Sequence, residues 1–324
     1  MSYKLIPIDN TDEWNDALDG VRHSFCHTRE HCYSISLTTG DQTSLFCFEK
    51  DGVRIVNPVI EREFSGFKDL SKPFGFSGFA GTGFHPDFLQ SWKRFVSEKN
   101  FVSGYLGLHP LFGVAGLFDD SEIHQYNTIY VIDLLPGYNE ILNSLSSGRK
   151  KQLKKFEEVS LSFSEDRKLL KTFFLENYNE FLKRRDAKNF YYLSSETISF
   201  LFTLENVCIV GAIEHGKCVA ATLFGYTKQM GNALYHASLP GAEHYSAHLV
   251  WYGVKKLKAL GIPALNLGGG SNGIAKFKEF FGAQTYPLKC VKQIYRQDVY
   301  EKLSKEAGVS SIQCNSFFPS YRKL

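Results

Sequence analysis

The sequence predicts an α/β protein of the α+β type, with two domains in which a mixed, mostly antiparallel sheet is flanked by helices. Its 324 residues exceed the size of one typical domain, and the 43% of hydrophobic residues suffice for a core in each. Short apolar runs alternate with amphipathic stretches, and the second half reads strand, strand, strand, helix, strand, helix, strand. That order is typical of helices packed on a sheet.

Periodicity and turn residues predict the elements of residues 1–127. Asp51-Gly52 predicts a hairpin, and Pro58 is expected where the second strand reaches an edge or bend. The predicted elements are a helix over 10–18 capped by Thr11 or Asp12, a helix within 25–37, strands over 44–49 and 53–60, a helix over 85–100 and a strand over 102–108.

Two candidate site residues lie in this first half. Asp69 opens a stretch rich in glycine and phenylalanine, up to Gly83, which we interpret as a loop at the mouth of a cleft. His109 follows a strand and is a candidate general base, although a structural histidine is the commoner outcome. His27 and His31 lack the flanking glutamate of a zinc motif, so we expect no metal site.

The second half carries the sharper pattern. Its predicted elements are a strand over 128–134, a helix over 138–158, a short strand over 161–163, helices over 166–188 and 196–204, strands over 207–214, 217–226 and 233–239, a helix over 246–260, a strand over 262–267, a helix over 277–281 and a strand over 286–295. No nucleophile elbow, metal cluster or paired carboxylate site appears in it, which favours direct group transfer.

A glycine-rich turn, LNLGGGSNG, follows the strand over 262–267. Gly269, Gly270 and Ser271 form its centre, and such a turn before a helix directs backbone N–H groups at one point. A dinucleotide motif is rejected because no acidic residue follows at the required distance. A P-loop is rejected because Ile274-Ala275 replaces its lysine and hydroxyl residue. A turn without any ligand remains the alternative.

Two basic features accompany this turn. Ile274, Phe277, Phe280 and Phe281 are predicted to form one buried arc of the helix. Lys278 borders this arc, so its ammonium can face a cleft and bind a phosphate or an oxyanion. Five positive charges fall within 149–155, and Arg149, Lys150 and Lys151 are candidate contacts for a donor's phosphates. A snorkelling lysine and a solvated helix face are the alternative interpretations.

These motifs resemble the FemAB/FemX family of non-ribosomal peptidyltransferases, and the order of elements resembles the acetyltransferase (GNAT) fold. The resemblance rests on GRKKQLKKFEEVSLSF, YNEFLKRRDAKNFYYLSSETISFL, KCVAATLFGYTKQMGNALYHASL and LNLGGGSNGIAKFKEFFGA, and on HTREHCYSISLTT, NPVI and DLSKPFGFSG. It implies two GNAT-like domains with a cleft between them. Residues 1–127, completed by 298–324, would form the acceptor side, and residues 128–297 the donor side.

The resemblance also implies roles for individual residues. Lys278, beside Phe277, would contact the substrate's phosphates and the transferring carbonyl, and Tyr235 would orient the acceptor. Lys278 and Tyr235 are thus the catalytic candidates. The basic residue of the long helix matches Arg184 or Arg185 equally well. The substrate-binding candidates are Phe277, Arg184, Arg185, Gly269, Gly270, Ser271, His109 and Asp69.

The sequence departs from both related groups in ways that leave the donor open. The helical arm that helps some family members hold tRNA has no counterpart. Before the helix over 246–260, LPGAEHYSAH replaces the glycine turn with which GNAT enzymes bind the pyrophosphate of acyl-CoA. We therefore expect no permanently bound cofactor and a co-substrate that is either aminoacyl-tRNA or acyl-CoA.

The expected function is an acyltransferase acting on an amine of a cell-envelope precursor, either a peptidoglycan peptide or a surface-polysaccharide sugar. The alternatives are an acetyl-CoA-dependent N-acetyltransferase of a nucleotide-linked sugar, and a non-catalytic module that binds RNA or another anion. Expected partners are a small or lipid-linked acceptor and, for one donor, tRNA. Seven scattered cysteines, no signal peptide and no apolar run of about 20 residues predict a cytoplasmic protein that reaches the membrane only at its inner face.

Overall fold

The computed structural model describes residues 2–157, 162–270, 272–309 and 317–323. The chain divides into two compact units, one formed by Met1–Tyr126 with Pro287–Leu324 and the other by Asn127–Tyr286. It leaves the first unit within β7 (Ile123–Asp133) and returns within β13 (Gln284–Ile294). The return comes before residue 298, where we expected it, because residues 289–294 of β13 pair with β6 of the first unit.

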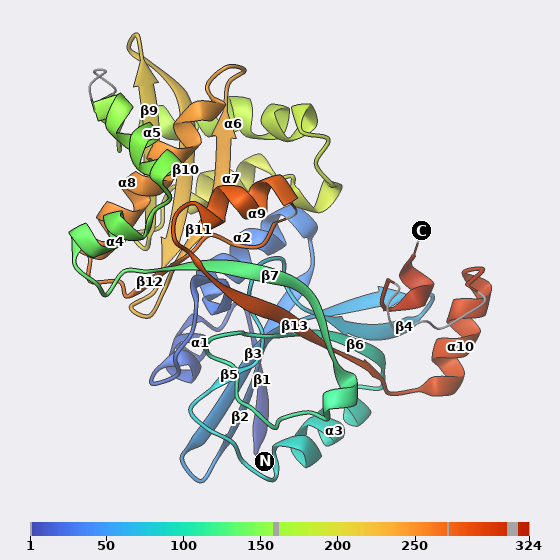
Figure 1. Ribbon diagram of the computed structural model, residues 1–324. Helices are drawn as coiled ribbons and strands as arrows, with labels where there is room; N and C mark the ends of the chain where they lie inside the picture. The colour runs from blue at the N-terminus through green and yellow to red at the C-terminus, as the bar shows by residue number, and fades with distance from the viewer. Residues whose placement is uncertain (1, 158–161, 271, 310–316, 324) are drawn as a thin grey trace. The chain divides into compact units, whose positions relative to one another are not determined.

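The sheet of the first unit has the strand order β1-β2-β3-β4-β6-β13 (Figure 1). Every neighbouring pair is antiparallel except β4 and β6, and the short β5 pairs with β3. Its strands are β1 (Tyr3–Pro7), β2 (Gln42–Lys50), β3 (Val53–Phe64), β4 (Phe67–Ser71), β5 (Ala80–Gly81) and β6 (Phe101–Leu108). Its helices are α1 (Thr11–Leu18), α2 (Arg29–Thr39), α3 (Phe88–Glu98) and α10 (Gln297–Glu306).

Helix α3 shows how this unit builds its core. Phe88, Trp92, Phe95 and Val96 are all buried, and their spacing places them on one helical face. Trp92 meets the ring of Phe46 on β2 edge-on, at a centroid distance of 5.0 Å. Each such side chain contributes on the order of 2–3 kcal/mol by leaving water. The sequence predicted this helix, over residues 85–100.

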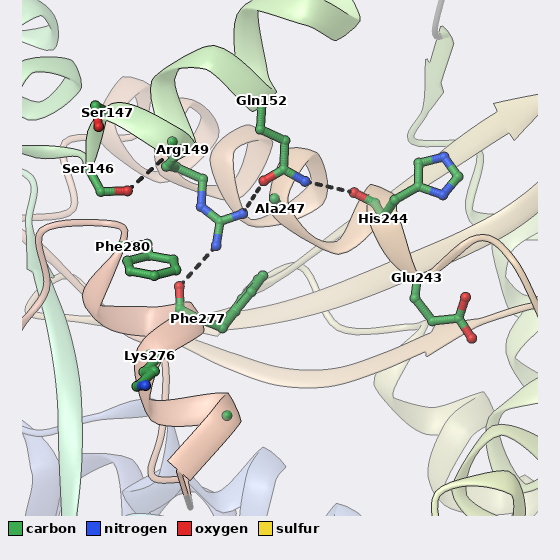
Figure 2. A pocket seen from close by; sticks show the side chains of 12 residues that line it. Ser146, Ser147, Arg149, Gln152, Glu243, His244, Ala247, Lys276, Phe277 and Phe280 are labelled. Atoms are coloured by element: carbon green, nitrogen blue, oxygen red, sulfur yellow. Dashed lines mark hydrogen bonds between the residues drawn. The ribbon is translucent and has the colours of Figure 1, made fainter.

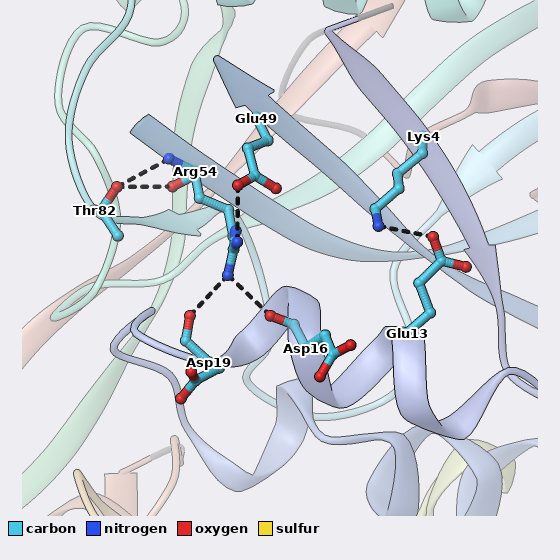
Figure 3. Close-up of polar contacts among 7 residues, drawn as sticks. All are labelled: Lys4, Glu13, Asp16, Asp19, Glu49, Arg54 and Thr82. Atoms are coloured by element: carbon cyan, nitrogen blue, oxygen red, sulfur yellow. Dashed lines mark hydrogen bonds and ion pairs between the residues drawn. The ribbon is translucent and has the colours of Figure 1, made fainter. Parts of the chain in front are cut away.

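Arg54 fastens β3 to the end of α1. Its guanidinium donates to the backbone carbonyls of Asp16 (2.9 Å) and Asp19 (2.8 Å) and pairs with Glu49 at 2.8 Å (Figure 3). Carbonyls at a helix C-terminus carry partial negative charge, so a cation is favourable there. At the other end of α1, Asn10 provides the cap, because its side chain accepts the Glu13 N–H. The predicted caps, Thr11 and Asp12, already lie inside the helix.

Pro58 lies inside β3, which continues to Phe64, beyond the predicted end of the strand at residue 60. On one side Pro58 faces Leu45 of β2. On the other side, the pairing with β5 involves only Ile55 and Val56, and the pairing with β4 starts at Ile60. Proline has no N–H to donate, and it falls in the gap between these two partners.

The sheet of the second unit has the strand order β7-β12-β11-β10-β9-β8. Only β11 and β12 are parallel. The remaining pairs are antiparallel. The fold class predicted for the chain, mixed and mostly antiparallel sheets flanked by helices, is therefore confirmed. Its strands are β8 (Ser162–Ser164), β9 (Val207–Glu214), β10 (Lys217–Tyr226), β11 (Gly231–Ser238) and β12 (Ala264–Asn266).

One helix predicted for this unit is wrong. The single helix expected over 138–158 is two helices, because Leu145 adopts an extended conformation (φ −66°, ψ 147°). The next helix restarts with the Ser146 hydroxyl accepting the Arg149 N–H at 3.2 Å. The helices are α4 (Tyr138–Ser144), α5 (Ser147–Glu157), α6 (Arg167–Arg184), α7 (Ser195–Leu201), α8 (Ser246–Ala259) and α9 (Asn272–Glu279).

Candidate functional site

The glycine turn after β12 is fastened to the neighbouring strand β7. Tyr130 of β7 accepts the Leu267 N–H at 2.8 Å and donates its own N–H to the Gly268 carbonyl at 3.2 Å. Gly268 has a φ of +77°, and its N–H donates to the Asn266 side chain at 2.7 Å. A Cβ on Gly269 would lie 2.8 Å from Nδ2 of Asn127, so a larger residue there would require the Asn127 side chain to move.

The parallel strands β11 and β12 separate directly before this turn. Their pairing comprises Gly231 with Leu265 and Asn232 with Asn266, after which β11 continues to Ser238. Side chains paired in register project from the same face of a sheet, so the two asparagine amides are neighbours. Both are buried, and both amide atoms of Asn232 and the nitrogen of Asn266 have no hydrogen-bond partner among the described residues. Sequence reasoning missed this polar pair.

Lys278 of α9 lies at the turn. The predicted buried arc beside it is wrong for Ile274 and Phe280, which are 55% and 47% exposed. Lys278 is only 8% exposed, and its Nζ donates to the Gly269 carbonyl and lies 5.9 Å from the ring centroid of Tyr130. In the described parts of the chain, no carboxylate pairs with it. Burial lowers the pKa of Lys278 to about 8. At neutral pH the ammonium is charged, and two of its three protons remain available for a ligand.

Phe277, the neighbour of Lys278, faces a different set of residues. Its ring lies under the guanidinium of Arg149, with Cζ 4.6 Å from the ring centroid, and Phe281 holds the same group at 4.3 Å. The Arg149 guanidinium donates to the Phe277 carbonyl at 3.1 Å and to the Gln152 side chain at 2.6 Å. Burial lowers the pKa of Arg149 to about 10.

A pocket of about 620 Å³ lies beside Arg149, between α5, α8 and α9 (Figure 2). The first turns of α5 and α8 and one side of α9 form its walls. Its lining residues are Ser146, Ser147, Gly148, Arg149, Gln152, Glu243, His244, Ala247, Gly273, Lys276, Phe277 and Phe280. Lys278 is absent from this lining, whereas Gly273, the last glycine of the turn motif, is part of it.

The other two phosphate candidates on α5 do not join this pocket. Lys150 donates to the Asn143 carbonyl at 2.8 Å, and Lys151 is exposed. The sequence could not distinguish these two lysines from Arg149, because all three belong to one run of basic residues. The helix break before Ser146 determines which side of α5 is buried. A Cβ on Gly270 would lie 2.7 Å from Cγ2 of Ile274. Ser271 lies outside the described residues.

Tyr235 and the two arginine candidates surround the far end of β11. The ring of Tyr235 is buried and meets Tyr178 of α6 edge-on at 5.7 Å. Arg184 donates to the Ser238 carbonyl, whereas Arg185 pairs with Glu243 at 3.5 Å. Arg184 is therefore held against the strand that carries Tyr235. The contacts of Lys278, by contrast, are with β7 and the glycine turn.

His236, which the sequence did not mark, joins three elements near Tyr235. Its Nδ1 lies 2.8 Å from the Thr222 hydroxyl and its Nε2 lies 3.1 Å from the Ser246 hydroxyl at the start of α8. Burial, with a smaller contribution from Arg185, lowers the pKa of His236 to about 4, so the ring is neutral at physiological pH. No spacing pattern links these residues, because a turn separates the strand from the helix.

The two candidates of the first unit have contacts typical of structural residues. The Asp69 carboxylate accepts from Arg62 (2.8 Å), Arg322 (2.6 Å) and the Tyr321 hydroxyl (3.0 Å). It lies in strand β4 rather than in the expected loop. His109 accepts the Phe112 N–H at 3.1 Å through Nδ1, and its ring stacks on that of Phe112 at 4.6 Å. Burial, and then the neighbouring His27, lower the pKa of His109 well below its usual value.

Comparison with known proteins identifies the fold. No protein-family model and no curated protein match the sequence. The crystal structure of FemX matches with a TM-score of 0.67 over 93% of this chain and 99% of FemX, at 12% sequence identity. The chain has a FemX-like fold. The resemblance stated from the sequence motifs therefore holds at the level of the fold.

Other solved structures share the FemX-like fold. L-PGS from Bacillus licheniformis has a TM-score of 0.55 and 12% identity over 86% of this chain and 91% of that one. The C-terminal domain of an Agrobacterium fabrum protein assigned as a lysylphosphatidylglycerol synthetase has a TM-score of 0.56 and 12% identity, over 87% and 91% of the two chains. None of the helices that the structure describes has the length and apolar composition to cross a bilayer.

Proposed function

We propose that the protein is an acyltransferase that moves an acyl or aminoacyl group from an activated ester or thioester to an amine of a cell-envelope precursor. The observation that carries the proposal is the position of Lys278. A buried ammonium with no acidic partner among the described residues is held at a glycine turn where two parallel strands separate. The FemX-like fold supports a group-transfer enzyme over a binding module.

In the proposed reaction, the acceptor amine attacks the carbonyl carbon of the donor directly. A C–N bond forms, the C–O or C–S bond of the donor breaks, and the proton lost by the amine leaves with the alcohol or thiol. The negative charge that develops on the carbonyl oxygen is stabilised by the free protons of Lys278 Nζ. Tyr235, held against Tyr178, orients the acceptor.

The co-substrate and the acceptor are proposed as classes. Aminoacyl-tRNA and acyl-CoA both supply an activated carbonyl on a phosphate-bearing carrier, and no permanently bound cofactor is needed. The acceptor is a peptidoglycan peptide, a surface-polysaccharide sugar or a lipid-linked precursor. The structurally similar Agrobacterium protein is named as a lysylphosphatidylglycerol synthetase, and this name supports a lipid-linked acceptor. We place the reaction in the cytoplasm or at the inner face of the membrane, which the protein would contact peripherally.

The test is transfer measured with radiolabelled donors. Purified protein is offered a mixture of charged tRNAs or acetyl-CoA, together with a muramyl-peptide nucleotide or an amino-sugar nucleotide. We expect product with one donor class. Lys278→Met should lower turnover about 10²–10³-fold, because one donor to the oxyanion is lost. Lys255→Met, at an exposed lysine on α8, is the matched control. Full transfer by Lys278→Met would contradict the proposal.

A further inference from the structure

The segment that joins α6 to α7 (Figure 1) exposes two neighbouring aromatic rings. Phe190 is 55% exposed and Tyr191 is 42% exposed, and their ring centroids lie 4.3 Å apart. Both belong to a short 3₁₀ helix, Asn189–Tyr191. We call residues 188–192 the aromatic turn. Adjacent apolar side chains on a surface mark a contact with a partner or a membrane more often than single ones do.

Hydrogen bonds to α6 hold the aromatic turn in place. The Tyr178 hydroxyl donates to the Tyr191 carbonyl at 3.0 Å. The Asn179 side chain donates to the Leu193 carbonyl at 2.9 Å and accepts the Leu193 N–H at 3.3 Å. The backbone that carries the two rings is therefore fixed, and their exposure is a property of the fold. A fixed turn presents its rings to a partner without the entropy cost of ordering a loop.

Positive charge surrounds the aromatic turn. Residues 183–192 contain four cationic side chains and one carboxylate, that of Asp186. Lys188 is exposed and has no ion pair to a described residue, and Arg184 donates to a backbone carbonyl of β11. The excess of positive charge favours an anionic partner. It is modest, because two of the cations have carboxylate partners, in the ion pairs Lys183–Glu180 and Arg185–Glu243.

A membrane that contains anionic lipid matches this combination better than RNA does. At a membrane surface, aromatic rings are buried at the boundary between headgroups and acyl chains, and lysine or arginine beside them meets the lipid phosphates. A groove for RNA requires continuous positive charge and separate ring faces on which bases stack. Here two of the cations are paired, and the two rings contact each other. Most of the affinity for a membrane would come from the rings, so a modest charge suffices.

The aromatic turn is linked to Tyr235, which we proposed to orient the acceptor. Tyr178, whose hydroxyl holds the turn, also meets the ring of Tyr235 edge-on at 5.7 Å. Arg184, at the end of the same helix, is held against the strand that carries Tyr235. All of these residues belong to the second unit. A membrane at the aromatic turn would bring the headgroup of a lipid-linked acceptor to this end of β11.

We propose that the protein docks on anionic membranes through the aromatic turn, with Phe190 and Tyr191 inserted among the headgroups and Lys188 on the lipid phosphates. The proposal rests on the function proposed above in one respect, because it selects the lipid-linked precursor among the acceptor classes. Binding to vesicles requires no donor, so the two proposals fail separately. An inactive protein that binds vesicles through this turn refutes the first alone, and an active protein that binds no vesicles refutes the second alone.

The first experiment is sedimentation of the whole chain with vesicles of phosphatidylcholine, with or without phosphatidylglycerol, at low salt. We expect binding to the vesicles that contain phosphatidylglycerol and weaker binding to the others. Phe190→Ser should weaken the binding about 10-fold, because one ring no longer leaves water. Lys188→Gln should weaken it about 5-fold, because one charge at the membrane surface is lost.

Two matched variants serve as controls for these changes. Phe84→Ser removes a ring of the first unit that is also 55% exposed. Lys93→Gln removes the charge of an exposed lysine on α3. Both should bind vesicles as tightly as wild type, because neither residue belongs to the aromatic turn.

Tryptophan fluorescence identifies the inserted segment directly. The native tryptophans, Trp14, Trp92 and Trp251, are at most 5% exposed, so lipid should not change their emission. In Phe190→Trp, vesicles that contain brominated phosphatidylglycerol should quench the new emission, whereas in Phe84→Trp they should not. This measurement keeps the test decisive even if a serine variant does not fold.

Three results would overturn the proposal. The first is no binding to vesicles that contain phosphatidylglycerol, and the second is an equal loss of binding in Phe84→Ser and Phe190→Ser. The third is emission of Phe190→Trp that brominated lipid leaves unchanged. Quenching of that variant by an RNA oligonucleotide but not by vesicles would overturn it in favour of an RNA surface.

Discussion

At the scale of single residues, Lys278 is buried, and among the described residues only a backbone carbonyl and an aromatic ring offset its charge. Burial lowers its pKa to about 8, below the ordinary value of about 10.4. Between these pH values the unfolded chain binds more protons than the folded one, so the stability attributable to this residue rises with pH. Below pH 8 the folded protein bears the full cost of the buried charge.

Lys278→Met should therefore raise the stability at pH 7, by on the order of 1–3 kcal/mol. The gain should disappear at pH 10.5, where the wild-type lysine is neutral. Urea unfolding of wild type and variant at the two pH values measures the difference in their free energies of unfolding. The contributions of other titrating groups cancel in this difference, because both proteins contain them. A variant less stable than wild type at pH 7 would show that the ammonium stabilises the fold, contrary to our interpretation.

Activity should change with pH in the opposite direction. The ammonium of Lys278 loses its proton as the pH rises through about 8, and with it the charge that stabilises the oxyanion. Turnover with a proven donor should fall above that pH. Lys278→Arg, which stays charged, should keep its residual activity constant over the same range. A wild-type profile that is flat up to pH 10 would contradict this role.

His109 should make the first unit sensitive to acid. Its ring is held neutral by burial and by the nearby His27, whose own pKa burial lowers to about 3. In the unfolded chain both protonate near pH 6.5, so stability falls as the pH drops below that value. His109→Asn preserves an acceptor for the Phe112 N–H, and we expect a smaller difference in urea midpoint between pH 7 and pH 5 than in wild type. Equal differences in both proteins would show that other groups control the acid response.

Candidate site residues were predictable where one element positions them. Helical spacing was enough to place Lys278 at the border of the arc that contains Phe277, but it also placed Ile274 and Phe280 in the core, where they do not lie. It could not separate Arg149 from Lys150 or choose between Arg184 and Arg185, because those answers depend on a helix break and on a distant carbonyl. The buried pair Asn232 and Asn266 left no local signal, since only strand pairing brings them together. The catalytic and binding roles, and the cleft between the domains, stay predictions.

At the scale of elements, Gly253 of α8 and Gly148 of α5 differ in the space that the surrounding residues leave for a methyl group. A Cβ on Gly253 would lie 2.5 Å from the ring of Phe224, whereas a Cβ on Gly148 would meet nothing within 4 Å. Gly253→Ala should destabilise the protein by about 1–3 kcal/mol through overpacking. Gly148→Ala should be neutral or slightly stabilising, because alanine is the better helix former. Thermal unfolding of the two variants compares them, and equal melting temperatures would refute the packing argument.

Elements defined by their own periodicity were predicted well from the sequence, among them α3, the hairpin at Asp51-Gly52 and the strands β9 and β10. The errors occur where distant partners decide. Pro58 lies within a strand because its neighbours leave a gap there, and β4 forms around Asp69 because β3 and β6 flank it. The break at Leu145 involves Phe280, whose carbonyl accepts the Ser146 N–H at 3.0 Å. No window of sequence around these positions contains that information.

At the scale of the whole molecule, Asp69 joins strand β4 to the end of the chain through Arg322 and Tyr321. Asp69→Asn should cost about 1–3 kcal/mol, because charge-assisted hydrogen bonds become neutral ones in a buried site. Substrate affinity should not change if the role is structural. Chemical denaturation and the KM for the acceptor measure the two effects. A raised KM without any loss of stability would restore the substrate-binding role predicted from the sequence.

The division of the chain has a consequence for protein synthesis. The second unit is one continuous segment, whereas the first needs residues from both ends of the sequence. Until the ribosome has translated β13, the nascent β6 lacks its antiparallel partner and leaves an unpaired strand edge. The second unit consists of one segment that is translated before residues 287–324, whereas the first unit waits for them. Chaperone dependence during translation should therefore concentrate on the half that emerges first.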